Sequence, residues 1–285
     1  MRLDGKIALI TGAGSGIGRE LAIEAANRGL VQYLVGRRSS KLEQTRRRLK
    51  PGAVAHCVEA DITAAEGRLA IRNAVERGGH GLDILVNNAG CISNRPFLES
   101  ADADVARMVD TNLMAPILLT RDLLPFLQRS DGARIVNIGS IYGDIATPGF
   151  AVYAATKFAL RGLSDALRRE LAADGIGVTY AAPRATQTEG IERISAALKR
   201  QGVVLDDPAP VARWIWSAVE RERRSAYPPT VERLFVGIQR ILPALIDRAL
   251  GGKRRDRQSH GASPTESDPE WTAAPTAERP YTKSR

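Results

Sequence analysis

Ser140, Tyr153 and Lys157 are residue types that together could move a proton. A phenol and an ammonium four residues apart, as in Tyr153 and Lys157, lie on the same face of a helix. A phenol titrates near pH ~10, but an adjacent cation favours the phenolate and brings the pKa toward the working range of an acid/base catalyst. Tyr153 is therefore a candidate general acid or base. Because an exposed helix face could show the same spacing, other segments must support this interpretation.

A glycine-rich turn near the N-terminus is the first such segment. Residues 6–10 form an apolar run typical of a buried strand, residues 11–18 read TGAGSGIG, and residues 19–28 have helical character. Glycines let the backbone approach a pyrophosphate, and the helix N-terminus beyond them offers free amide donors and the positive end of the helix dipole. A flexible linker would lack the flanking strand and helix. The pattern therefore predicts a dinucleotide-binding turn.

Three further motifs follow in order along the chain. The apolar run 83–86 leads into Asn-Asn-Ala-Gly at 87–90, Asn112 follows in a helical stretch, and a strand over 134–138 leads to Ser140. With these motifs the chain resembles the short-chain dehydrogenase/reductase family. The family's Thr-Gly-x3-Gly-x-Gly and Asn-Asn-Ala-Gly patterns match 11–18 and 87–90, and its catalytic tetrad matches Asn112, Ser140, Tyr153 and Lys157. The resemblance covers residues 1–190 motif by motif and is loose beyond them.

The resemblance implies an α/β fold, a doubly wound Rossmann-type parallel sheet of about seven strands in a single domain. The apolar runs agree with it: 31–35, 54–58, 83–86, 134–138 and 177–181 alternate with helix-like stretches long enough for parallel crossovers. We expect residues 1–190 to form the dinucleotide-binding core with the tetrad, and 191–250 to form a substrate lid and C-terminal amphipathic helices of the same domain. Residues 251–285 are poor in apolar positions and are expected to be a disordered tail.

The family also supplies the roles of the tetrad. It implies hydride transfer between a nicotinamide and a carbonyl carbon, with Ser140 holding the carbonyl oxygen and Tyr153 giving it a proton. Lys157 would lower the pKa of Tyr153 and reach the nicotinamide ribose, and Asn112 would position a water for the proton relay. Oxidation would run the same steps backwards. The alternative from another functional class is a protein that senses a dinucleotide without turnover.

Cofactor choice depends on the residues that follow the second predicted strand. A chain specific for NAD usually places an Asp or Glu there, which binds the ribose 2′-hydroxyl. This chain has Gly36, Arg37 and Arg38 instead. No carboxylate repels a 2′-phosphate at these positions, and a guanidinium can bind phosphate oxygens in a fork. The sequence favours NADP, with NAD possible; Arg38 could alternatively begin a solvated helix.

The remaining cofactor contacts come from the resemblance. Asp61 and Ile62 match the family's adenine-contacting segment, although Asp61 could equally be a helix N-cap before Thr63. After the sixth strand the family has Pro-Gly, a spacer and Thr, whereas here Arg184 follows Pro183 and Thr188 keeps its place. Arg184 could contact the cofactor pyrophosphate, an acidic substrate group or solvent. The complete cofactor-binding set comprises Gly12, Ser15, Gly16, Ile17, Gly18, Arg37, Arg38, Asp61, Ile62, Asn88, Ala89, Gly90, Tyr153, Lys157, Pro183 and Thr188.

The C-terminal region carries the hints about substrate and partners. Helices are expected over 189–200, as an active-site lid, and over 208–221; the family's final strand followed by Asp-Gly-Gly is missing. Apolar residues recur at helical spacing over 231–246, and Pro243 should split this stripe into two helices, followed by basic residues up to position 257. The stripe fits a membrane surface, a substrate tunnel, a dimer element or simple packing on the core. A membrane contact or a substrate tunnel would favour a lipophilic substrate, and related chains with such an ending resemble enzymes acting on steroids, terpenoids, retinoids or acyl chains. The alternative is a small polar alcohol oxidised with NAD.

Composition limits the remaining classes. A net charge of +9 and a pI near 9.9 raise nucleic acid as a partner, but the basic residues are dispersed and no nucleic-acid motif occurs, so none is expected. Two cysteines suggest no disulfide framework, and three histidines show no ligand spacing, so no metal site is expected. We expect no signal peptide, and no apolar run approaches the ~18 residues of a transmembrane helix. We expect a cytoplasmic homo-oligomer, a dimer or tetramer that pairs through 108–127, with possible peripheral membrane contact through 231–257.

Overall fold

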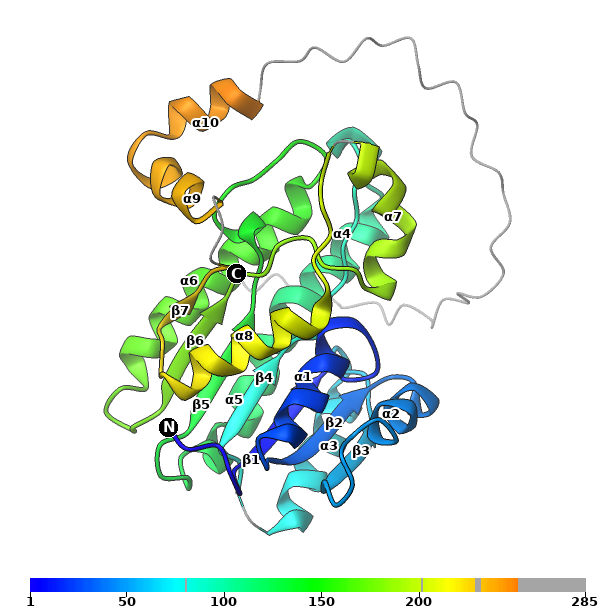
Figure 1. Ribbon diagram of the computed structural model, residues 1–285, viewed down its shortest axis with the longest axis vertical. Coiled ribbons are helices and arrows are strands. Elements are labelled where there is room, and N and C mark those ends of the chain that lie inside the picture. Colours follow the sequence, from blue (N-terminus) through cyan, green and yellow to red (C-terminus); the bar gives the residue numbers. More distant parts are fainter. Residues whose placement is uncertain (80, 201, 229–231, 251–285) are drawn as a thin grey trace, which may run out of the picture. The chain divides into compact units, whose positions relative to one another are not determined.

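The computed structural model describes residues 1–250 except positions 80, 201 and 229–231 (Figure 1). Seven parallel strands form one sheet in the order β3-β2-β1-β4-β5-β6-β7. The strands are β1 (Ile7–Thr11), β2 (Val31–Gly36), β3 (Ala55–Glu59), β4 (Ile84–Asn87), β5 (Arg134–Ile138), β6 (Gly177–Ala181) and β7 (Ser225–Ala226). This confirms the predicted doubly wound sheet. The strand order reverses between β1 and β4, and in such sheets ligands bind beyond the carboxyl ends of the strands at that point.

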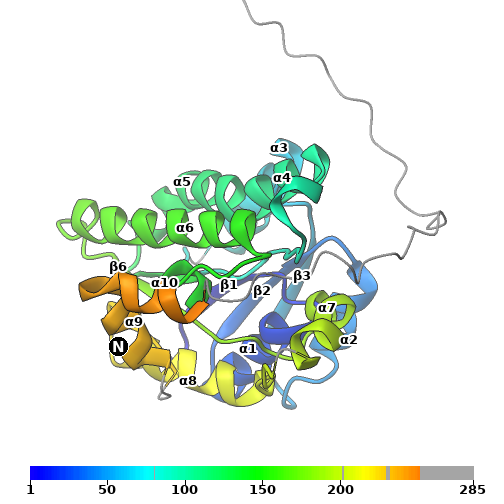
Figure 2. The same cartoon turned by 90° about the horizontal axis from the view of Figure 1, so that it is seen from above.

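Helices cover both faces of the sheet (Figure 2). One layer contains α1 (Gly16–Asn27), α2 (Ser39–Arg46) and α8 (Pro208–Glu220), and the other contains α3 (Ala65–Gly78), α5 (Ala115–Leu127) and α6 (Ala151–Glu170). Successive side chains of a strand point to opposite faces, so Ile10 joins the core under α1 and α8 while Leu9 joins the core under α3 and α5. Because both faces are buried, the strands are continuous apolar runs, which made them visible in the sequence.

Strand β7 corrects the expectation that the family's final strand is missing from this chain. Ser225 and Ala226 form β7 and pair with Tyr180 and Ala181 of β6. The strand has two residues and only Ala226 is buried, so it produces no apolar run. The chain thus keeps the strand and lacks only the Asp-Gly-Gly that the family usually places after it.

The two C-terminal helices are those that Pro243 predicted. They are α9 (Glu232–Ile241) and α10 (Pro243–Leu250), and the proline occupies the first position of α10, where its missing N–H costs nothing. Val236 and Ile246 pack against Ile145 in a small cluster that also touches Ile141. Other members of the stripe, above all Leu234 and Ile241, stay exposed. The helices therefore use one part of their apolar surface on the core and leave the rest uncovered in the monomer.

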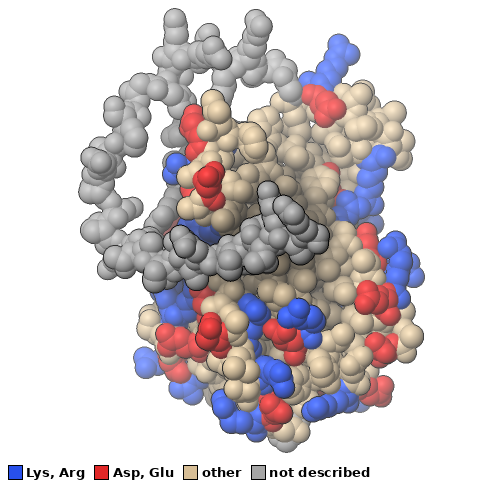
Figure 3. Space-filling model, turned by 180° about the vertical axis from the view of Figure 1, so that it is seen from behind, with Lys and Arg blue, Asp and Glu red and all other residues tan. Residues whose placement is uncertain are grey.

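The charge distribution matches the dispersed pattern of the sequence. On the face shown in Figure 3, Lys and Arg alternate with Asp and Glu. Several of the ion pairs join residues three or four apart on one helix, as in Arg28–Glu24 and Arg46–Glu43. Over the described residues, every helix is too short or too polar to cross a bilayer. The same residues bring no three His, Cys, Asp or Glu side chains together as metal ligands. The predicted tail, 251–285, lies outside the described part of the chain.

Candidate active site

The glycine-rich turn lies at the carboxyl end of β1. Gly12 and Gly16 have φ angles of +66° and +52°, a region that favours glycine. A Cβ atom on Gly18 would lie 2.1 Å from the carbonyl oxygen of Gly12, so only glycine lets α1 start this close to the turn. The first amides of α1 therefore point to the place where the strand order reverses, as a pyrophosphate site requires.

The Asn-Asn-Ala-Gly segment is fixed against this turn by Thr11. The Thr11 hydroxyl oxygen accepts hydrogen bonds from the backbone N of Asn88 and of Ala89 at 2.9 and 3.0 Å. In return, the Asn88 side-chain amide donates to the Thr11 carbonyl oxygen at 2.8 Å. The two sequence motifs thus form one wall of the site, and Asn88, Ala89 and Gly90 stand beside the glycine turn.

Asn112 lies in a single π-helical turn, Asp110–Met114, between α4 (Asp102–Val109) and α5. Such turns often occur at functional sites. The buried Asn112 amide accepts from the Cys91 backbone N and donates to the Cys91 carbonyl oxygen, both at 2.8 Å, and also donates to the Thr156 hydroxyl at 3.2 Å. It therefore joins the loop after β4 to α6, next to Lys157. The water-positioning role remains a prediction.

Ser140 lies two residues beyond β5 and is the N-cap of a short 3₁₀ helix, Ile141–Gly143. Its hydroxyl accepts a hydrogen bond from the Tyr142 backbone N at 3.2 Å. The buried phenol of Tyr180, on β6, donates to the Ser140 carbonyl oxygen at 3.1 Å and accepts from the Ser140 backbone N at 3.4 Å. Tyr180 thus fixes the backbone of Ser140.

The sequence interpretation missed Tyr180. The available signal was a polar aromatic in the strand expected beside the one that leads to Ser140, together with two nearby glycines. A Cβ atom on Gly139 or Gly143 would lie 2.2 or 2.1 Å from the Tyr180 side chain. Both glycines are therefore required by the space that this ring fills.

Tyr153 and Lys157 share one face of α6, as their spacing predicted. The Lys157 Nζ lies 5.6 Å from the centroid of the Tyr153 ring and donates to the Ile138 carbonyl oxygen at 2.9 Å. Tyr142 packs edge-on against Tyr153 with the ring centroids 6.0 Å apart. The helix therefore delivers both side chains to the carboxyl end of β5, where Ser140 stands.

The pKa of Tyr153 differs from the sequence expectation. Burial raises this pKa to about 12, while a hydrogen bond with Ser140 acts in the opposite direction. Burial also lowers the pKa of Lys157 to about 8. The amine lies over the phenol ring and is engaged with the Ile138 carbonyl, so desolvation outweighs attraction between the cation and a phenolate. The pair is close, but in this arrangement the Tyr153 proton is held rather than released.

The arginines predicted for the 2′-phosphate follow β2, and both are exposed. The Arg38 guanidinium forms an ion pair with Glu189 at 2.7 Å, and Lys41 pairs with the same carboxylate at 2.8 Å. Glu189 is the first residue of α7 (Glu189–Arg200), the predicted lid helix. Arg38 is therefore the N-cap residue of helix α2, and its side chain also forms an ion pair with the first residue of α7.

Asp61 lies two residues beyond the end of β3 rather than at it. Its carboxylate accepts hydrogen bonds from the backbone N and the hydroxyl of Thr63 at 2.9 and 2.7 Å. It closes the turn before α3, close to the alternative that the sequence offered, although the N-cap position itself is Ala64. Ile62 is buried in the core under α3.

Arg184, for which the sequence left three uses open, forms two ion pairs within the chain, and its contact with cofactor or substrate stays a prediction. Its guanidinium pairs with Glu232 of α9 at 3.1 Å and with Asp206 at 3.6 Å. The neighbouring Pro183 accepts a hydrogen bond from the Ile141 backbone N at 3.1 Å. The arginine that replaces the family's glycine thus connects the wall beside Ser140 to the C-terminal helices.

Asp144 is a second connection of this kind, which the sequence did not reveal. Its carboxylate is buried and forms ion pairs with Arg161 and, at 3.0 Å, with Arg240 of α9. The Tyr227 hydroxyl donates to it at 2.9 Å, and burial together with Asp144 raises the pKa of Tyr227 to about 12. Asp144, four residues after Ser140, therefore forms ion pairs with both α6 and α9.

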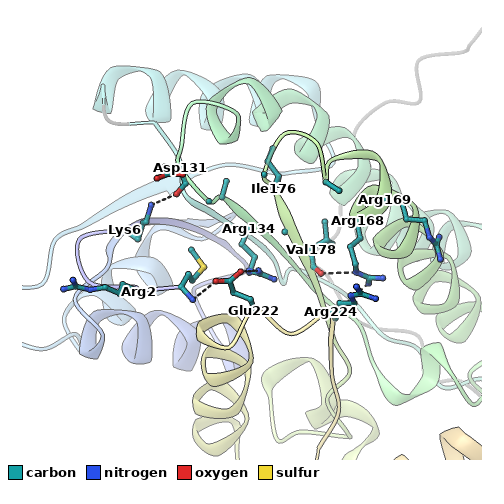
Figure 4. A pocket seen from close by; sticks show the side chains of 16 residues that line it. Arg2, Lys6, Asp131, Arg134, Arg168, Arg169, Ile176, Val178, Glu222 and Arg224 are labelled. Carbon is teal, nitrogen blue, oxygen red and sulfur yellow. Dashed lines mark hydrogen bonds and ion pairs between the residues drawn. The ribbon is translucent and has the colours of Figure 1, made fainter.

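A pocket of about 850 Å³ opens at the opposite end of the sheet (Figure 4). Lys6, Arg134 and Arg168 line it, and each is engaged: Lys6 with Asp83 at 2.7 Å, Arg134 with Glu222 at 3.3 Å and Arg168 with Asp165 at 2.7 Å. These residues lie at the amino ends of the strands or near them, away from Ser140 and Tyr153. The pocket is not the candidate active site.

Comparisons with known proteins agree with this geometry. A family model described as short chain dehydrogenase matches residues 6–199. The chain is 34% identical over 200 residues to a 3beta-hydroxysteroid dehydrogenase of Mediterraneibacter gnavus, covering 70% of this chain and 72% of that protein. A short-chain dehydrogenase from Sphingobium yanoikuyae, solved in complex with NADPH, has a TM-score of 0.73 and 27% identity over 91% of this chain and 100% of that one.

A short chain dehydrogenase/reductase from Burkholderia phymatum, solved in complex with NAD, shares the fold. Its TM-score is 0.78, with 24% identity over 86% of this chain and 96% of that one. The family match covers more than half of the chain and includes every predicted tetrad residue. The chain therefore belongs to the short-chain dehydrogenase/reductase family and is an oxidoreductase that uses a nicotinamide dinucleotide.

Proposed function

We propose that the chain interconverts a hydroxyl and a carbonyl on a lipophilic substrate, with NADP(H) as cofactor and Tyr153 as general acid/base. The observation that carries the proposal is the meeting of Ser140, Tyr153 and Lys157 at the carboxyl end of β5, where the buried Lys157 amine lies over the Tyr153 ring and donates to the Ile138 carbonyl. A bound nicotinamide supplies or accepts the hydride. The Ser140 hydroxyl holds the substrate oxygen, and Tyr153 gives it a proton in reduction or takes one in oxidation.

The protonated state of Tyr153 suits the reductive direction. A phenol whose pKa is raised to about 12 keeps its proton at neutral pH and is ready to donate it to a developing alkoxide. Lys157, buried beside the ring, would stabilise the phenolate that remains after the transfer. Asn112 would contribute by holding the loop after β4 against α6.

The dinucleotide would lie over the glycine turn. Gly12, Ser15, Gly16, Ile17 and Gly18 would provide the close backbone approach, and Asn88, Ala89 and Gly90 stand beside them in the same wall. The turn fits such a group, because any side chain at Gly18 would collide with the Gly12 carbonyl. NADP over NAD is supported by Arg37 and Arg38 at the end of β2 and by the NADPH complex of the Sphingobium protein. NAD is the alternative.

A lipophilic substrate is supported by the surroundings of Ser140. Ile141 and Ile145 follow it and touch the cluster formed by α9 and α10, whose exposed apolar side chains continue beyond it. The relative from Mediterraneibacter gnavus is a dehydrogenase of a hydroxysteroid. We therefore place steroids, terpenoids, retinoids and long acyl chains ahead of small polar alcohols.

The same exposed surfaces suggest partners and location. Met114 and Phe158 expose large apolar side chains in the segments that the family pairs between subunits, which supports a homo-oligomer. The uncovered part of α9 and α10 would lie against a second subunit or a membrane surface; the basic residues that follow in the sequence up to 257 favour an anionic surface and lie outside the described part. We place the protein in the cytoplasm, peripheral at the membrane.

The experiment is a turnover screen of the purified full-length chain on lipophilic alcohols and ketones with each nicotinamide cofactor, with Tyr153→Phe alongside. We expect NADP(H)-dependent turnover that falls roughly 10²–10⁴-fold in Tyr153→Phe while the Kd for NADPH changes little. If the variant keeps its turnover, Tyr153 is not the acid/base. If cofactor binds and nothing on the panel reacts, a small polar substrate or the dinucleotide-sensing alternative takes its place.

A further inference from the structure

Glu189 forms an ion pair with Arg38, one of the two arginines that the proposed function assigns to the cofactor phosphate, and another with Lys41 nearby. Its carboxylate pairs with the Arg38 guanidinium at 2.7 Å and with the Lys41 ammonium at 2.8 Å. Both cations belong to the start of α2, directly after β2, whereas Glu189 comes from the other side of the site as the first residue of α7. Lys41 and Arg38 lower the pKa of the Glu189 carboxyl, which is therefore charged at neutral pH.

This bridge lies beside the glycine turn. A Cβ atom on Gly16 would be 2.6 Å from the methyl carbon of Thr188, the residue before Glu189. On the other side, a Cβ atom on Gly14 would be 3.0 Å from the Cβ of Lys41. The carboxylate of Glu189 thus joins two segments that flank the turn, at the end where a 2′-phosphate would meet the residues after β2.

We propose that Glu189 is a specificity-determining residue, whose carboxylate takes the place of the 2′-phosphate on Arg38 and Lys41 and must be displaced by NADP(H) but not by NAD(H). The proposal rests on the assignment of Arg38 to the phosphate under the proposed function. Glu189 then reduces the advantage that the two cations give to NADP(H).

The balance of charges allows the exchange. The side chains of Arg38, Glu189 and Lys41 are 59%, 36% and 31% exposed, and pairs exposed to this degree contribute little stability. A phosphate carries more negative charge than a carboxylate and can accept from both cations at once. We therefore expect the 2′-phosphate of NADP(H) to displace the Glu189 carboxylate. The affinity for NADP(H) is then lower by the free-energy cost of breaking the ion pairs of Glu189 with Arg38 and Lys41. Since each exposed pair is weak, we expect a loss of roughly fivefold.

The test compares Glu189→Gln with wild type in the full-length chain. The Kd values of NADPH and NADH are measured by fluorescence titration at one ionic strength. We expect Glu189→Gln to bind NADPH about fivefold more tightly, with the Kd of NADH changed less than about twofold. Glu192→Gln is the matched control: it removes the same charge from the same end of α7, where Glu192 is exposed, and should change neither Kd. Unchanged NADH binding also shows that the variant is folded.

A second pair of variants tests whether Glu189 affects NADPH binding through Arg38. In the background Arg38→Gln, the added substitution Glu189→Gln should tighten NADPH by less than in wild type, because one of the two contested cations is gone. Equal tightening of NADPH and NADH would overturn the proposal, since it would mean that Glu189 merely obstructs the site. An unchanged NADPH affinity in Glu189→Gln would overturn it as well.

These outcomes are separate from those that test the proposed cofactor. A wild-type chain that prefers NADH removes the proposal of NADP as native cofactor, yet a gain in NADPH affinity in Glu189→Gln would still support the role of Glu189. A wild-type chain that prefers NADPH, with no effect of Glu189→Gln, keeps the cofactor proposal and removes this one.

Discussion

Tyr180 holds Ser140 from the neighbouring strand through both backbone polar groups of the serine. The phenol donates to the Ser140 carbonyl oxygen at 3.1 Å and accepts from its backbone N at 3.4 Å. We expect Tyr180→Phe to lower kcat several-fold, with the Kd of the dinucleotide unchanged. The Ser140 backbone N would lose its Tyr180 partner and the carbonyl would keep only the Gly143 backbone N, at a cost of about 1–2 kcal/mol. Steady-state kinetics with a cofactor titration checks this. An unaltered kcat would show that the 3₁₀ turn alone positions Ser140.

The buried amine of Lys157 makes stability depend on pH. Its folded-state pKa is about 8, against an ordinary value of 10.5, so between these values the unfolded chain binds the proton that the folded chain has lost. The stability of the wild type should therefore rise with pH through this window. Lys157→Met removes the group, and we expect it to be more stable than wild type at pH 7, by on the order of 2 kcal/mol, and inactive.

The stability difference between Lys157→Met and the wild type should shrink as pH rises toward 10, because the wild type then no longer has to bury a charged ammonium group. Urea unfolding of both proteins at pH 7 and pH 9.5 measures it. A stability difference that is constant or grows with pH would mean that Lys157 is charged in the folded protein over this whole range.

Gln32, in β2, has a side-chain amide that is fully buried. Among the described residues, neither its amide nitrogen nor its amide oxygen has a hydrogen-bond partner, although the side chain is fully buried. Replacing it by Leu should stabilise the protein by about 1 kcal/mol, since the cost of burying unpaired polar atoms is removed at similar volume. The measurement is the urea midpoint. A destabilised Gln32→Leu variant would show that the amide is paired in solution, for example by a buried water.

Arg184 should matter for the C-terminal helices and not for the cofactor. Arg184→Gln removes the ion pairs to Glu232 and Asp206, so we expect faster hydrogen exchange in α9 and a Kd for NADPH changed less than about twofold. Arg213→Gln, at an exposed position of α8, provides the control and should leave both unchanged. A marked loss of NADPH affinity in Arg184→Gln would restore the interpretation that Arg184 contacts the pyrophosphate.

Local patterns in the sequence determined most of the fold. The apolar runs 134–138 and 177–181 coincide with β5 and β6, the helix expected over 189–200 is α7, and Pro243 divides the C-terminal stripe where expected. Each of these features depends on residues close together in the chain, whose periodicity reports strand or helix directly. Strand β7 was not recognised in the sequence because a strand of two residues shows no periodicity.

For the site, the sequence determined the residue types and their order, while the tertiary structure decided what each one touches. Spacing alone placed Tyr153 and Lys157 on one helix face, but the direction of the Tyr153 pKa depends on how far the folded chain removes the phenol from water. The partners of Ser140, Asp144 and Arg184 come from β6, α9 and the segment after α7. Contacts of this kind join residues tens of positions apart, and only the packed sheet brings them within hydrogen-bonding distance.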